Sequence, residues 1–244
     1  IYDNAACRQN KGTHFAIRRL RSFMLEHFKK YGYRGYFIKA DVRKYFYNID
    51  HTILKLKLEK LKIPNDIIFL LFCIIDSFNY DANAGLPMGN QTSQCFALLY
   101  LNDVDRAVKE FYRIKHYIRY MDDLVMIIDI RDKAKILISD IAKLLEKENL
   151  VINSKSQIIP IKNGIEFLGW VFKYSKTGQI IQTLKQGSKK RILSRAEHRM
   201  FEYNQHIISK ESLESTAISY RGFFQKGDCY HFRKKIMSKL KRKE

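Results

Sequence analysis

The sequence lacks any apolar run long enough to cross a membrane. Its longest run, residues 67–75, has nine apolar residues, whereas a spanning helix needs about 20. No secretory signal opens the chain. Its four cysteines are scattered without a C-x-x-C pair, which argues against a disulfide framework or a zinc site. We therefore expect a cytoplasmic protein with no membrane association.

Acidic residues are also scarce. The chain has 25 Asp and Glu against 45 Lys and Arg, a net charge of +20, and nucleic acid is the usual partner of so basic a protein. Residues 185–244 contain 16 basic and six acidic residues, so 16 − 6 = +10, half of the total. Because Tyr and Phe are interleaved with these cations, we predict a separate helical, basic domain that grips a nucleic-acid duplex.

Three acids stand where a metal site could form. Asp122 and Asp123 lie between two runs of strand-forming residues, which predicts a β-hairpin with both acids at its tip. Asp41 ends an alternating strand over residues 36–42. An isolated Asp-Asp pair is most often a solvated turn, but three converging carboxylates repel one another unless cations hold them. Mg²⁺ prefers such oxygen ligands, so the pattern predicts a two-metal site.

The order of elements predicts an α+β fold. An antiparallel sheet of split βαβ type carries helices on one face, and the basic helical domain follows it. A Gly/Pro loop at residues 85–90 opens one helix with free backbone N–H groups. Helices are expected at 13–32 with Thr13 as N-cap, at 51–62, from 65 to about 78, at 91–108 and at 132–148, and strands at 36–42, 151–152, 157–161, 165–172 and 179–183.

Four segments, in this order, resemble motifs of reverse transcriptases. Residues 37–46 resemble motif A, residues 120–123 motif C, residues 150–155 motif D, and residues 166–170 the primer-grip hairpin. The resemblance implies an RNA-directed DNA polymerase that binds an RNA template, a primer or cDNA, and deoxynucleoside triphosphates. It also implies a polymerase palm over 35–184, a basic helical thumb over 185–244, and a partial fingers region, with residues 1–34 as a fingers remnant and palm entry helix.

The resemblance implies roles for individual residues. Asp41 and Asp122 would bridge two Mg²⁺ ions, which Mn²⁺ can replace, with Asp123 supporting them and the Val42 carbonyl as a further ligand. Lys155 matches a lysine that protonates pyrophosphate, and an ordinary surface lysine is the alternative. Phe46 matches the residue that rejects a ribose 2′-hydroxyl, and a core aromatic is the alternative. Further nucleotide contacts are implied for Tyr45, Met88, Gly89 and Gln94, and template or primer contacts for Phe167, Leu168, Gly169, Trp170, Lys189, Lys190 and Arg191.

Departures within one motif favour a subfamily. Most reverse transcriptases carry Gln-Gly-x-x-x-Ser-Pro where this chain has residues 88–94, with Met88 for the Gln and Gln94 for the Pro. This pattern, together with residues 6–14, is similar to reverse transcriptases of diversity-generating retroelements. That resemblance implies error-prone copying of a template-repeat RNA and a small basic accessory protein as partner. Two alternatives stay open: a group II intron or retron-like enzyme, and a non-catalytic RNA-binding remnant, because the usual fingers segment is not matched.

Overall fold

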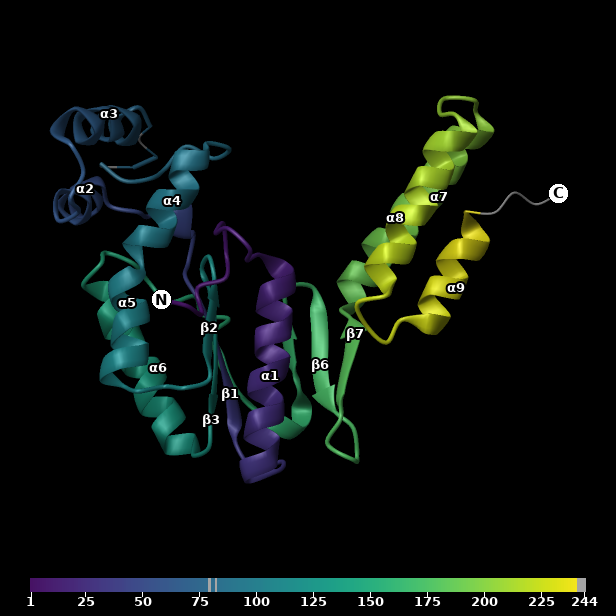
Figure 1. Ribbon diagram of the computed structural model, residues 1–244, viewed down its shortest axis with the longest axis horizontal. Coiled ribbons are helices and arrows are strands. Elements are labelled where there is room, and N and C mark those ends of the chain that lie inside the picture. Colours follow the sequence, from purple (N-terminus) through teal and green to yellow (C-terminus); the bar gives the residue numbers. More distant parts are fainter. Residues whose placement is uncertain (79, 82, 241–244) are drawn as a thin grey trace. The chain divides into compact units, whose positions relative to one another are not determined.

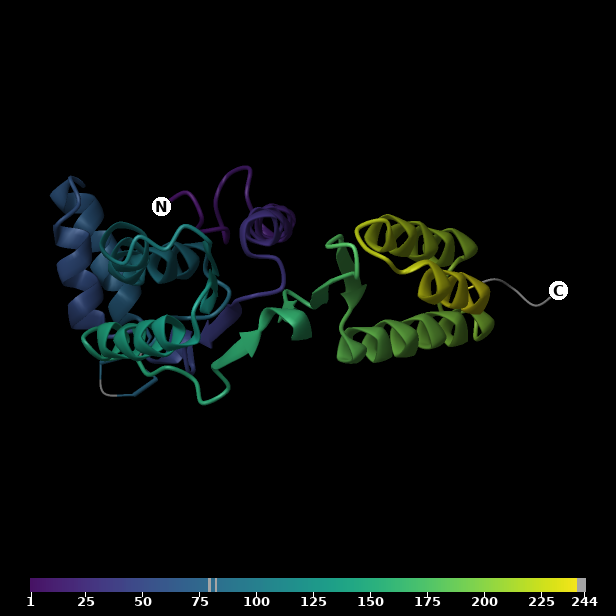
Figure 2. The ribbon, with the colours of Figure 1, turned by 90° about the horizontal axis from the view of Figure 1, so that it is seen from below.

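The computed structural model describes residues 1–78, 80–81 and 83–240 (Figures 1 and 2). The chain forms two compact units, residues 1–161 and residues 162–244. This division lies earlier than the predicted boundary near residue 184. The reason is that the strands after residue 164 form a sheet of their own instead of joining the first one.

The first unit is built on a four-stranded antiparallel sheet in the order β2-β3-β1-β4. The strands are β1 (Tyr36–Asp41), β2 (Tyr117–Tyr120), β3 (Asp123–Ile128) and β4 (Gln157–Pro160). Strand β1 therefore lies between two strands that come much later in the chain, which is the arrangement predicted for a split βαβ unit. The strand expected at 151–152 is reduced to one bridge between Val42 and Ile152.

The helices of this unit largely follow the predicted pattern. They are α1 (Thr13–Tyr31), α2 (His51–Glu59), α3 (Asn65–Asp76), α4 (Gln91–Tyr100), α5 (Asn102–Arg106) and α6 (Arg131–Glu146), with short turns η1 (Tyr45–Tyr47), η2 (Ala107–Phe111) and η3 (Ile161–Asn163). Two details differ from the prediction. Gly12 occupies the N-cap of α1 in place of Thr13, which is the first helical residue. The helix expected at 91–108 is broken at Leu101 and ends in a π-helical turn.

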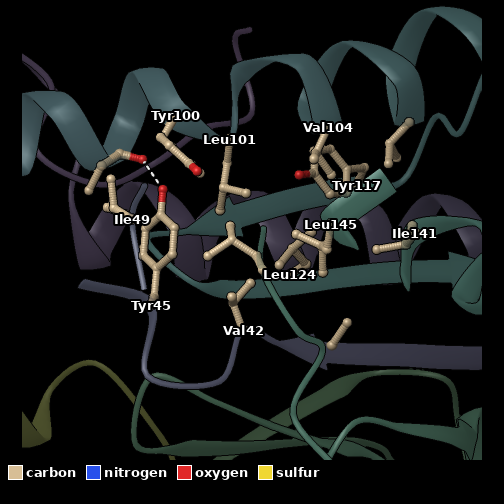
Figure 3. Close-up of a cluster of buried hydrophobic side chains, with 14 of the residues drawn as sticks. Val42, Tyr45, Ile49, Tyr100, Leu101, Val104, Tyr117, Leu124, Ile141 and Leu145 are labelled. Carbon is tan, nitrogen blue, oxygen red and sulfur yellow. Dashed lines mark hydrogen bonds between the residues drawn. The ribbon is translucent and has the colours of Figure 1, made fainter. Parts of the chain in front are cut away.

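Both faces of the sheet are buried. On one face, alternate residues of β1 and β3 join α4, α5 and α6 in one hydrophobic cluster, which includes Val42, Leu101 and Leu124 (Figure 3). The intervening residues Phe37 and Val125 are also inaccessible, and α1 lies over β2 and β3 on that side (Figures 1 and 2). The prediction of helices on one face did not include this cover by α1.

The second unit joins a small sheet to three helices. Strands β5 (Ile165–Phe167), β6 (Trp170–Tyr174) and β7 (Ile180–Leu184) form an antiparallel meander, and α7 (Gln186–Asn204), α8 (Lys210–Phe224) and α9 (Tyr230–Lys239) follow it. The predicted helical character after residue 185 is confirmed up to Lys239, and residues 241–244 lie outside the described residues. In the described ranges, no helix is both long and apolar enough to cross a bilayer.

Candidate functional site

The register of the sheet brings the three predicted acids together. Asp41, the last residue of β1, pairs directly with Asp123, the first residue of β3. Asp123 also pairs with Tyr120 across the hairpin, so Asp122 lies in the two-residue turn between them. Met121 takes a left-handed φ of 55° in that turn, which suits a tight hairpin. The hairpin and the strand end therefore place all three acidic residues at the same end of the central strands β1 and β3, as the sequence predicts.

The electrostatics of Asp122 reflect this crowding. Burial, together with the negative charges of Asp41 and Asp123 and a hydrogen bond with Asp41, raises the pKa of Asp122 to about 6. A divalent cation such as Mg²⁺ prefers oxygen ligands and would relieve the repulsion between these carboxylates. The chemistry of the donors therefore suits such an ion. Within the described part of the chain, however, no group of three or more His, Cys, Asp or Glu side chains lies in an arrangement that could hold a metal ion.

Asp41 is held by the turn over residues 153–156, which overlaps the segment that resembles motif D. Asn153 donates its side-chain N–H to Asp41 Oδ2 at 2.6 Å, and its backbone N–H donates to the Asp41 carbonyl at 2.7 Å. The Asp41 backbone N–H donates to Ser156 Oγ at 3.1 Å. The first of these bonds fixes one carboxylate oxygen of Asp41, and the other two fix its backbone. Asn153 and Ser156 are thus site residues that were missed individually.

Two predicted site residues flank this turn. Lys155 is exposed, and its backbone N–H donates to Asn153 Oδ1 at 3.1 Å, so its chain position is fixed beside Asp41 while its ammonium group remains in solvent. Val42 has a fully buried side chain in the hydrophobic cluster. A metal contact by Val42 would therefore use its backbone carbonyl, as the resemblance implies.

The turn after β1 is bonded to the Gly/Pro loop. The backbone N–H of Leu86 donates to the Phe46 carbonyl at 2.8 Å, and Tyr47 Oη donates to Met88 Sδ at 3.8 Å. Phe46 is half-buried against the core, Met88 is 68% exposed and Gly89 has a φ of 96°. Gln94 is half-exposed in the first turn of α4. Segments 45–47 and 85–90 thus lie together.

Tyr45 is placed differently from its predicted role. Its side chain is 2% exposed, and its hydroxyl donates to the Ala97 carbonyl at 2.5 Å inside the hydrophobic cluster (Figure 3). Burial raises the pKa of this phenol. The ring therefore packs the core beneath the site, because a buried side chain cannot reach a nucleotide without repacking.

The predicted template and primer contacts all lie in the second unit. Leu168 and Gly169 form the tight turn between β5 and β6, with φ of 48° and 83°. Phe167 and Trp170 are buried, and the Trp170 ring lies tilted against the Phe223 ring with centroids 5.3 Å apart. The buried side chains of Phe167 and Trp170 therefore stabilise the unit. The cations are more available: Lys190 and Arg191 are exposed and Lys189 is half-exposed on α7.

Comparisons with known proteins agree with this geometry. The family model described as "Reverse transcriptase (RNA-dependent DNA polymerase)" matches residues 3–172. A comparison with curated proteins found no match.

Solved structures of telomerase share the fold. A telomerase from Candida albicans, in complex with the TWJ fragment of telomeric RNA, matches with a TM-score of 0.57 and 14% identity, over 98% of this chain and 49% of that one. An apo telomerase from Candida tropicalis, truncated from the C-terminal domain, gives a TM-score of 0.55 and 19% identity over 70% and 39%. The chain thus spans half or less of these relatives. Since the family model covers well over half of the sequence, the chain belongs to the reverse transcriptase family of RNA-dependent DNA polymerases.

Proposed function

We propose that this chain copies RNA into DNA by metal-dependent nucleotide addition at Asp41, Asp122 and Asp123. The observation that carries the proposal is the pairing of Asp41 with Asp123 across β1 and β3, which puts the Asp122 turn beside the end of β1. When bound, two Mg²⁺ ions would stabilise the attacking primer hydroxyl and the leaving pyrophosphate. The elevated pKa of Asp122 supports a site built for cations, since its charge is costly without one.

Other residues of both units take supporting roles in this proposal. The Phe46 carbonyl accepts a hydrogen bond from the loop that carries Leu86. In this position the bulky Phe46 ring would exclude a ribose 2′-hydroxyl. Lys155 stands in the turn bonded to Asp41, in reach of a phosphate through its long side chain. The exposed cations Lys190 and Arg191 on α7 would contact the duplex backbone, because cations on a helix surface neutralise phosphates.

The direct test is primer extension. The 244-residue chain is supplied with an RNA template, an annealed DNA primer, deoxynucleoside triphosphates and Mg²⁺, and compared with Asp122→Ala. We expect extension by the wild-type chain and none above background by the variant. Equal extension by both proteins would contradict the catalytic role of the acids. Duplex binding without any extension would favour a non-catalytic RNA-binding protein, and a salt titration of binding would measure that activity alone.

We further propose the diversity-generating subtype, on the Met88 and Gln94 departures. Met88 is largely exposed at the loop beside the Phe46 turn, and its contact with Tyr47 is weak. Replacing a hydrogen-bonding Gln by Met would remove a polar check on the new base pair. The resemblance to this subfamily implies that sequenced cDNA carries substitutions concentrated opposite template adenines, and loss of the polar contact implies that Met88→Gln reduces them. An even error spectrum would favour a group II intron or retron-like enzyme.

A further inference from the structure

A wholly buried arginine lies beneath the acidic hairpin. Arg119, on β2, has no exposed surface, although arginine is among the residues least often buried. Its backbone is used at the sheet edge: the Arg119 N–H donates to the Asp3 carbonyl at 3.1 Å, and the Ala5 N–H donates to the Arg119 carbonyl at 2.9 Å. The strand is therefore fixed on its outer side by the N-terminal segment, and the guanidinium points into the protein.

The charge of Arg119 is neutralised by Asp105 on α5, which is also buried. Arg119 Nε donates to Asp105 Oδ1 at 2.7 Å, and one terminal nitrogen donates to Oδ2 at 2.7 Å. This bidentate geometry offsets the free-energy cost of removing the guanidinium from water better than a single hydrogen bond would. The Tyr117 hydroxyl donates to the same carboxylate. Replacing such a pair by apolar residues is often neutral for stability, so stability alone does not account for it.

The remaining donors of Arg119 reach two backbone carbonyls. One terminal nitrogen donates to the Met121 carbonyl at 2.9 Å, and the other donates to the Leu98 carbonyl at 3.1 Å. The Met121 carbonyl belongs to the peptide group that precedes Asp122. Met121 itself has a left-handed backbone, which a non-glycine residue keeps only where its surroundings enforce it. The tight hairpin is one such constraint, and the hydrogen bond from Arg119, whose own position is fixed by Asp105, adds a second one.

We propose that Arg119, held by Asp105, is a positioning residue that sets the orientation of Asp122 for metal binding. The inference rests on the proposed function of the acids. It assigns a role to a charged pair that touches neither metal nor substrate. Loss of the Met121 contact would free the turn and weaken metal affinity, while the rest of the sheet stays intact.

Two variants separate positioning from folding. Arg119→Lys keeps the buried charge, but an ammonium group cannot donate to the Asp105 carboxylate and the Met121 carbonyl at the same time in the geometry of a guanidinium. The triple variant Arg119→Met, Asp105→Leu, Tyr117→Phe replaces the whole network with apolar groups and leaves the Met121 carbonyl without its donor. A control is Lys57→Met, which removes a nearly buried lysine of α2 that pairs with Glu148 at 2.9 Å and with Asp103, and that does not contact Arg119 or Met121 in the contacts of the network.

The measurements are Mn²⁺ affinity by electron paramagnetic resonance, melting temperature, and the Mg²⁺ dependence of single-nucleotide addition. We expect both network variants to weaken Mn²⁺ binding and slow addition by about 10- to 100-fold, as loss of support around a metal ligand does. Lys57→Met should change only the melting temperature. Wild-type Mn²⁺ affinity in the folded network variants would overturn the positioning role alone. Absence of Mn²⁺ binding by the wild-type chain would overturn the proposed function beneath it.

Discussion

Neutralising Asp122 should stabilise the metal-free protein while destroying its activity. A one-unit pKa shift corresponds to about 1.4 kcal/mol, so raising the pKa from 3.8 to about 6 corresponds to at most about 3 kcal/mol. Because the carboxyl is only partly buried, solvent screening reduces this cost to about 1–2 kcal/mol. Asp122→Asn keeps the shape of the side chain and removes the repulsion by Asp41 and Asp123. The free energy of unfolding should rise by that amount at neutral pH.

The free energy of unfolding should also depend on pH in a defined direction. Since the pKa of Asp122 is higher in the folded than in the unfolded chain, the folded chain holds more protons between about pH 4 and about pH 6. The wild-type free energy of unfolding therefore falls as pH rises through this window, relative to the variant. The advantage of Asp122→Asn should be full at pH 7.5 and shrink toward pH 4.5.

Urea unfolding in the presence of a chelator measures both effects. Asp132→Asn serves as the control, since its side chain is 80% exposed, and it should change stability by less than about 0.5 kcal/mol. A variant at Asp122 that is less stable than the wild type at pH 7.5 would refute the reasoning. It would mean that the hydrogen bonds of the ionised Asp122 outweigh its burial and repulsion.

Two further outcomes follow from the contacts around the site. Asn153→Ala removes the donor to Asp41 and should slow nucleotide addition by about 10-fold or more. As a control, Asn149→Ala removes a similar bond to Asp50 at 2.9 Å and should leave the rate unchanged. Equal rates in both variants would mean that Asn153 does not support Asp41. Tyr45→Phe leaves the Ala97 carbonyl without its donor and should lower the free energy of unfolding by about 1–2 kcal/mol in a thermal melt. A large loss of activity with no loss of stability would instead return Tyr45 to the nucleotide site.

The acids and their elements could be predicted from the sequence, because strand ends and turns leave local patterns. Alternation along β1 and the apolar runs around the Asp122 turn are such patterns, and pairing of the two segments follows from the topology of a split unit. The β2–β3 hairpin was confirmed with both of its flanking strands. Tyr45 was misplaced because an aromatic beside a conspicuous motif has the same local pattern whether it faces the core or a ligand.

The support beneath the acids could not be predicted, because it depends on tertiary contacts alone. Arg119 in a strand and Asp105 in a helix each look like surface residues, and only the tertiary fold brings the two side chains together in the interior. Asn153 lies 112 residues from Asp41 in the sequence. Its bond lies next to the bridge between Val42 and Ile152, and the strand expected at 151–152 carries no local pattern that says which residue it pairs with.

The central claim is that Asp41 and Asp122 together support divalent-metal catalysis. Single-turnover addition of one deoxynucleotide to a primer on RNA, measured across a Mg²⁺ titration, tests it most directly. The account predicts saturable Mg²⁺ dependence for the wild-type chain, and a rate about 1,000-fold lower for folded Asp41→Asn and Asp122→Asn, equivalent to several kcal/mol of lost transition-state stabilisation. Addition at the wild-type rate by either folded variant, or a wild-type rate that does not depend on Mg²⁺, would contradict it.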